Sequence, residues 1–139
     1  MNIVITNLQS NISIPIPKIK FVVRLVCRKL KFKSSDLSIV FVGEKRMRRL
    51  NREYLGHDYV TDVLTFGKRG HPRVSPFYSE IVVCPAVAKR NAKHHDNPVQ
   101  REIILYVVHG ILHLCGYDDH KPEDVERMRQ KEQQIMDML

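Results

Sequence analysis

Residues 103–115 constrain the fold more than any other stretch of the chain. Of these thirteen residues, only Tyr106, His109, Gly110 and His113 are not plainly apolar. A helix that is apolar on nearly all sides belongs in the middle of a fold. The polar residues fall within an arc of about 100° around such a helix. The stretch therefore predicts a buried central helix with a single polar stripe.

Residues on both sides of this stretch predict where the helix begins and ends. Asn97 is a favoured N-cap, and Pro98 suits the first helical position. Gln100 completes a pattern similar to a capping box. Gly116 predicts a left-handed stop, because glycine adopts that conformation without steric cost. We therefore expect a helix from about residue 98 to Cys115, followed by a tight turn.

Two histidines of the polar stripe have the spacing of metal ligands. His109 and His113 are four residues apart, which places their Cβ atoms about 5–6 Å from each other on one face. Both imidazoles can then reach one ion, and the turn after Gly116 can supply His120 as a third ligand. Three protein ligands with an open fourth position are typical of catalytic zinc. Each histidine taken alone is also compatible with a hydrogen-bonded core residue.

The rest of the chain predicts a single α+β domain that spans residues 1–139. Alternating and β-branched residues predict strands at 2–6, 37–42, 63–66 and 81–84. Apolar residues at helical spacing predict further helices at 18–30, 44–55, 85–94 and 123–138. The chain is long enough to bury one core but too short for two. The predicted element order is β-α-β-α-β-β-α-α-α.

The charge distribution predicts a polyanionic partner such as nucleic acid. Residues 1–93 hold 18 basic and 6 acidic residues, whereas residues 94–139 hold 5 basic and 9 acidic residues. The five Phe and five Tyr are scattered and Trp is absent, so no aromatic platform for bases is predicted. The cations expected to contact nucleic-acid phosphates are Arg46, Arg49, Lys68, Arg69 and Arg73.

Composition also sets the expected compartment. No apolar run reaches the length of about 20 residues that a membrane span needs, and no secretory signal opens the chain. Three cysteines are too few for a disulfide framework. We therefore expect a cytoplasmic protein that has no membrane partner and no evident obligate partner chain.

Two motifs resemble those of the YbeY family of rRNA maturation factors. Residues 109–118, His-Gly-Ile-Leu-His-Leu-Cys-Gly-Tyr-Asp, are similar to the family signature H-G-x-L-H-L-x-G-Y-D-H, and residues 61–66 are similar to T-D-V-L-S-F. The resemblance implies a small, mainly four-stranded sheet packed around a central helix that carries two histidine ligands. It also implies one Zn²⁺ per chain and endonuclease activity on single-stranded RNA. The partners it implies are rRNA and the small ribosomal subunit.

The sequence departs from the family pattern at three positions. Asp119 occupies the place of the third family histidine, and His120 follows one residue later. His120 remains the expected third ligand, with Asp119 as its rival because zinc also accepts carboxylate oxygen. Leu55 replaces a family arginine, which leaves Arg52, one helical turn earlier, as its possible substitute. Val60 replaces the proline before the Thr-Asp pair.

No general base is obvious, and several functions therefore remain open. Glu102, Asp118 and Asp62 are weak candidates for acid–base catalysis, with Arg52 for phosphate binding. The favoured function is a metal-assisted endoribonuclease in rRNA maturation and ribosome quality control. One alternative is a non-catalytic, zinc-stabilised RNA-binding factor on the ribosome. A zinc peptidase is less compatible, because Gly110 stands where H-E-x-x-H has its glutamate.

Overall fold

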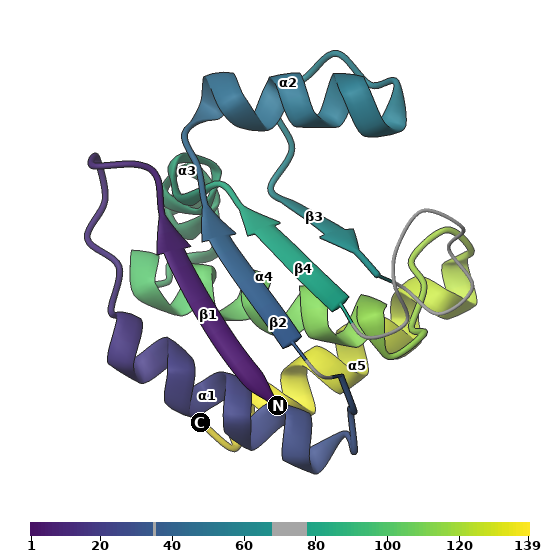
Figure 1. The fold of residues 1–139 in the computed structure, drawn as a ribbon. Helices are drawn as coiled ribbons and strands as arrows, with labels where there is room; N and C mark the ends of the chain where they lie inside the picture. The colour runs from purple at the N-terminus through teal and green to yellow at the C-terminus, as the bar shows by residue number, and fades with distance from the viewer. Residues whose placement is uncertain (35, 68–77) are drawn as a thin grey trace.

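The computed structural model describes residues 1–34, 36–67 and 78–139 of the 139-residue chain (Figure 1). Within these residues, four strands and five helices follow one another in the predicted order β-α-β-α-β-β-α-α-α. The strands are β1 (Asn2–Asn7), β2 (Asp36–Phe41), β3 (Val63–Phe66) and β4 (Tyr78–Val83). The helices are α1 (Ile16–Lys29), α2 (Glu44–Leu55), α3 (Pro85–His95), α4 (Val99–Leu114) and α5 (Pro122–Asp137). The prediction of an α+β fold with a small four-stranded sheet is confirmed.

The sheet has the strand order β1-β2-β4-β3. β1 and β4 both run parallel to the central strand β2, and β3 closes the sheet antiparallel to β4. The register aligns Ile5, Ile39 and Ile81 in one row across the three parallel strands. Because side chains alternate between the two faces of a strand, this row fixes one apolar face of the sheet.

That apolar face holds the main core, and α4 crosses it (Figure 1). Leu37, Ile39, Phe41 and Ile81 are fully buried there together with residues of α1, α4 and α5. On the opposite face, Met47 of α2 packs in a smaller apolar group. That group consists of Val42, Met47, Leu64, Val82 and Cys84.

Helix α4 is the central helix that the sequence predicts, and ten of its sixteen residues are buried. Gly110 allows this packing, because a Cβ atom there would lie 2.7 Å from Cγ2 of Ile81 on β4. The missing side chain therefore lets the helix approach the sheet closely.

The two ends of α4 differ in how well they were predicted. Gly116 has φ of 102°, as expected for a left-handed stop. At the other end, Pro98 occupies the N-cap position and no side chain caps the helix. The amide of Asn97 donates to Oε1 of Glu102 at 3.2 Å instead. The predicted capping box is therefore wrong, because the buried carboxylate of Glu102 takes the Asn97 side chain.

Candidate metal centre

His109 and His113 lie side by side at the C-terminal half of α4. Their ring centroids are 4.6 Å apart, with the ring planes nearly perpendicular. The two side chains retain 21% and 17% of their exposure, whereas most of the helix is fully buried. The helix therefore holds both rings on a rigid support while leaving their outer edges open to a ligand.

The turn after α4 carries a carboxylate to the two rings. The backbone N–H groups of Gly116 and Tyr117 donate to the carbonyls of His113 and Leu112, both at 3.0 Å, which reverses the chain. Oδ2 of Asp119 then lies 3.6 Å from Nε2 of His109 and 3.4 Å from Nε2 of His113. These three ligand atoms all lie within 4.8 Å of one another. Two imidazole nitrogens and one carboxylate oxygen are a donor set that suits zinc.

His120, the expected third ligand, points elsewhere. Its side chain is 84% exposed, and its Nε2 lies 3.3 Å from Oδ1 of Asp118. Within the described part of the chain, the group that includes both helical histidines contains Asp119 and not His120. Asp119 and His120 are consecutive residues of the turn, and consecutive side chains leave a turn in different directions. Only the Asp119 side chain therefore reaches the two helical histidines. Asp118 also accepts a hydrogen bond from the Asp119 backbone N–H at 3.0 Å.

A residue that the sequence analysis did not select orients the first histidine. Glu132 of α5 accepts a hydrogen bond from Nδ1 of His109 at 2.5 Å. This contact directs Nε2 of the same ring toward Asp119. A signal was present in the sequence: Glu132 lies on the same face of α5 as the buried residues Met128 and Ile135. A carboxylate within an apolar stripe needs a polar partner inside the fold.

The electrostatic environment of His109 reflects these carboxylates. Burial of the ring lowers its pKa, but the hydrogen bond and charge of Glu132, together with Asp119 and Asp62, raise the pKa above its usual value. Asp62, at the start of β3, therefore lies within electrostatic reach of the centre. Its own carboxylate accepts hydrogen bonds from Val63 N–H and the Thr61 hydroxyl. The excess of negative charge favours a bound cation.

The other predicted catalytic residues lie apart from this cluster. Glu102 is fully buried two turns earlier on α4, where it accepts hydrogen bonds from His95 and Asn97. Arg52 is exposed on α2, with its guanidinium 3.6 Å from Asp58. Asp118 lies in the turn after α4, next to Asp119, but its carboxylate contacts His120.

The predicted RNA-binding cations divide into two groups. Arg46 and Arg49 lie on α2 and line one cavity with Arg52. Lys68, Arg69 and Arg73 fall outside the residues that the structure describes.

The fold and the ligand cluster define a class of small α+β proteins whose central helix presents a His-x-x-x-His pair to a metal ion. Within that class, the chain belongs to the family described as endoribonuclease YbeY, whose family model matches residues 4–139. No helix in the described ranges has both the length and the apolar character needed to cross a bilayer.

Relatives and a solved structure agree with this assignment. Endoribonuclease YbeY of Chlorobium phaeovibrioides is 38% identical over 128 residues, covering 91% of this chain and 84% of the relative. The YbeY of an Anaeromyxobacter species is 40% identical over 101 residues, covering 73% of this chain and 53% of the relative. This chain therefore matches about half the length of the second protein. The solution structure of TM1509 from Thermotoga maritima has a TM-score of 0.68 at 29% identity, covering 96% of this chain and 86% of that one.

Proposed function

We propose that this chain is a zinc-dependent endoribonuclease that cleaves single-stranded RNA, with one ion held by His109, His113 and Asp119. The observation that carries the proposal is the convergence of two Nε2 atoms and one carboxylate oxygen at the open edge of a buried helix. Three protein donors leave a coordination position for water or substrate, which distinguishes catalytic from structural zinc. Family membership supports ribonuclease chemistry at this centre.

Glu132 and Asp118 orient two of the proposed metal ligands, His109 and Asp119. Because Glu132 accepts the Nδ1 proton of His109, the lone pair of the neutral ring lies on Nε2. Asp118 holds the backbone N–H of Asp119 and thereby stabilises the ligand turn. A divalent cation bound there would act as a Lewis acid on a phosphoryl oxygen and make water a better nucleophile at neutral pH. The set thus suits hydrolysis of a phosphodiester.

The surroundings of the histidines favour a nuclease over a peptidase. The position that holds the water-activating glutamate in H-E-x-x-H peptidases is Gly110, where an added Cβ atom would lie only 2.7 Å from Cγ2 of Ile81. A glutamate side chain has no space at that position. The basic residues of α2 supply instead the positive charge that phosphate binding requires.

We further propose that the RNA is rRNA associated with the small ribosomal subunit in the cytoplasm, and that residues 1–139 act as one domain. The family resemblance supports the substrate. The three cysteines Cys27, Cys84 and Cys115 are all free thiols, which is compatible with a reducing compartment.

Cleavage assays on purified protein test the proposal. Single-stranded RNA should be cut, a chelator should abolish cutting, and Zn²⁺ should restore it more effectively than Mg²⁺. A peptide library incubated with the same preparation should remain intact. Stoichiometric binding of rRNA without cleavage at any metal concentration would instead support a non-catalytic RNA-binding factor.

A further inference from the structure

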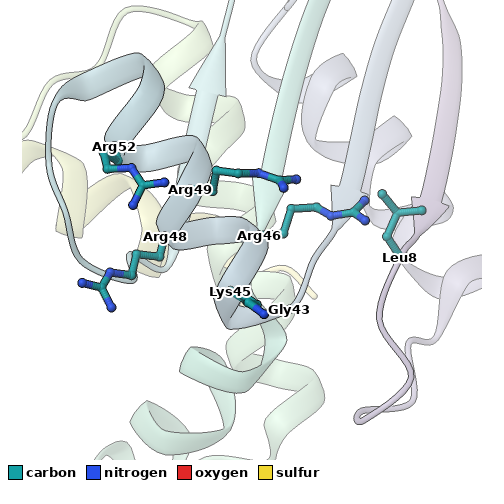
Figure 2. Close-up of a pocket in the computed structure, with 7 residues that line it drawn as sticks. All are labelled: Leu8, Gly43, Lys45, Arg46, Arg48, Arg49 and Arg52. Atoms are coloured by element: carbon teal, nitrogen blue, oxygen red, sulfur yellow. The ribbon is translucent and has the colours of Figure 1, made fainter.

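Helix α2 presents five basic residues to one cavity. Figure 2 shows Arg46 and Arg49 reaching from one side of the helix toward Leu8. The cavity that they line has a volume of about 700 Å³, and none of the described residues that line it is acidic. Its lining consists of Leu8, Gly43, Lys45, Arg46, Arg48, Arg49 and Arg52.

The cations of this cavity differ in their pairing. Arg48 and Arg52 lie 2.9 and 3.6 Å from Oδ1 of Asp58. Across residues 1–34, 36–67 and 78–139, neither Arg46 nor Arg49 lies within 4.0 Å of a carboxylate. Like charges three residues apart on a helix repel each other. A bound polyanion would relieve that repulsion.

Hydrogen bonds and an ion pair hold the turn that follows α2 against the same helix. Gly56 has φ of 71°, and its N–H donates to the Arg52 carbonyl at 3.1 Å. The side-chain amide of Asn51, which is only 1% exposed, donates to the backbone carbonyl of Tyr59 at 3.0 Å. Asp58 adds its ion pair with Arg48. The turn therefore has a fixed shape, which lowers the entropic cost of binding a ligand there.

This turn displays aromatic rings, which the sequence analysis did not anticipate. The rings of His57 and Tyr59 stack with centroids 5.5 Å apart and an interplanar angle of 11°. The hydroxyl of Tyr59 lies 3.3 Å from Nδ1 of His57, and the Tyr59 residue is 55% exposed. His57 and Tyr59 are separated by one acidic residue, and this spacing is no recognisable sequence motif. Their rings are aligned only because the turn has a fixed shape.

We propose that α2 and residues 56–59 form a docking surface for single-stranded RNA, in which arginines hold the phosphates and a nucleobase stacks on the Tyr59 and His57 rings. Arg46, Arg49 and Arg52 recur every three residues, about 4.5 Å apart along the helix axis. The turn that carries the aromatic pair follows directly after the C-terminal end of this helix. A cationic track beside an aromatic face is the combination that binds single strands without sequence preference.

The aromatic pair favours RNA over an acidic protein segment as the occupant. Carboxylates alone would need only the arginines, whereas stacked exposed rings match the planar faces of unpaired bases. Paired bases in a duplex are not available for such stacking, which favours single strands. The inference rests on the proposed ribonuclease function, because it assigns that enzyme a substrate surface outside the metal centre.

Fluorescence anisotropy with a labelled single-stranded RNA of sixteen nucleotides tests the proposal. A chelator is present, so cleavage does not interfere and the result does not depend on the metal centre. The double variant Arg46→Gln/Arg49→Gln is compared with Lys20→Gln/Arg24→Gln, which removes the same charge from exposed residues of α1. Tyr59→Leu is compared with Tyr59→Phe, which keeps the ring. Circular dichroism confirms that each protein is folded.

The α2 double variant should lose affinity and lower the slope of log K against log salt by about 1.4, while the α1 double variant leaves the slope unchanged. Tyr59→Leu should weaken binding about five- to hundredfold with no change in slope, and Tyr59→Phe should bind like the parent.

Equal losses for the two double variants, or full affinity of Tyr59→Leu, would overturn the proposal. Full RNA affinity of the α2 variant would also overturn it and would leave an acidic protein as the occupant. Each of the four variants should keep the metal content of the parent protein, which separates this test from that of the metal centre.

Discussion

The two faces of the sheet differ in how firmly their helices are held. On one face, α4 buries ten residues among large apolar side chains such as Phe41 and Ile81. On the other face, α2 buries only Met47 and Asn51, and Val4 of the edge strand remains 47% exposed. Each buried aliphatic side chain contributes roughly 1.5–3 kcal/mol. The α4 face therefore supplies most of the stability, and the α2 face supplies charge.

This difference matches what we propose that each face holds, a metal ion on the α4 face and RNA phosphates on the α2 face. Metal ligands need fixed positions, because bond lengths near 2 Å tolerate little movement. His109 and His113 therefore belong on the helix with the most rigid packing. Phosphate contacts tolerate more variation, and long arginine side chains on an exposed helix are sufficient for them.

Substitution of His113 should have the largest effect. His113→Ala removes one of the two imidazoles on α4, so RNA cleavage should fall by about a thousandfold or more. The fold should survive, because the side chain is partly exposed at the end of the core. Elemental analysis and a cleavage assay on the same sample measure both quantities. Full cleavage that resists a chelator would refute a role for the centre.

Truncations in the two cores measure the difference between the faces directly. Ile111→Ala on α4 should lower the free energy of unfolding by about 4 kcal/mol, and Met47→Ala on α2 by about 2 kcal/mol. Both side chains are fully buried, but the smaller group around Met47 can collapse more easily. Urea denaturation followed by circular dichroism gives both values. Equal losses would show that the two faces are equally firm.

Substitution of Glu132 tests how the α4 face orients its ligands. Glu132→Gln should weaken metal binding about ten- to hundredfold, because it weakens the carboxylate hydrogen bond to His109. Gln133→Glu, on the exposed side of α5, is a control that alters the same helix without reaching the histidines. Competition with a chelating dye measures the affinity. An unchanged affinity for Glu132→Gln would contradict the assigned positioning role.

Thiol labelling should reveal the smallest difference between the faces. Burial, with a smaller contribution from Cys115, raises the pKa of Cys27 to about 12, and burial also raises the pKa of Cys84. Both thiols are thus protonated at pH 8, and labelling requires local opening. Cys84 belongs to the α2 group and should react a few times faster than Cys27 in the main core. Mass spectrometry of the labelled peptides gives the two rates, and faster labelling of Cys27 would reverse the comparison.

The sequence predicted local structure well where periodicity was strong. The buried α4, the glycine stop at Gly116 and strand β3 all follow from residue patterns within short windows. The strand order β1-β2-β4-β3 does not follow from such windows, because pairing between distant strands depends on the packing of the whole chain. The close approach of Gly110 to the sheet does not follow from such windows either, because its partner Ile81 lies on a strand far away in the sequence.

The candidate site was only partly predictable. The helical pair His109 and His113 follows from i,i+4 spacing. The choice between Asp119 and His120 depends on how one turn is hydrogen-bonded, which spacing does not determine. Glu132 comes from another helix, and its contact with His109 exists only after α5 has packed against α4.

Metal analysis of Asp119→Ala beside His120→Ala tests the central claim most directly. The two variants change neighbouring residues of one turn, and only Asp119 lies near both imidazoles. After dialysis against trace zinc, His120→Ala should retain about one ion per chain, and Asp119→Ala should retain almost none. Loss of the ion from His120→Ala together with full occupancy of Asp119→Ala would contradict the account.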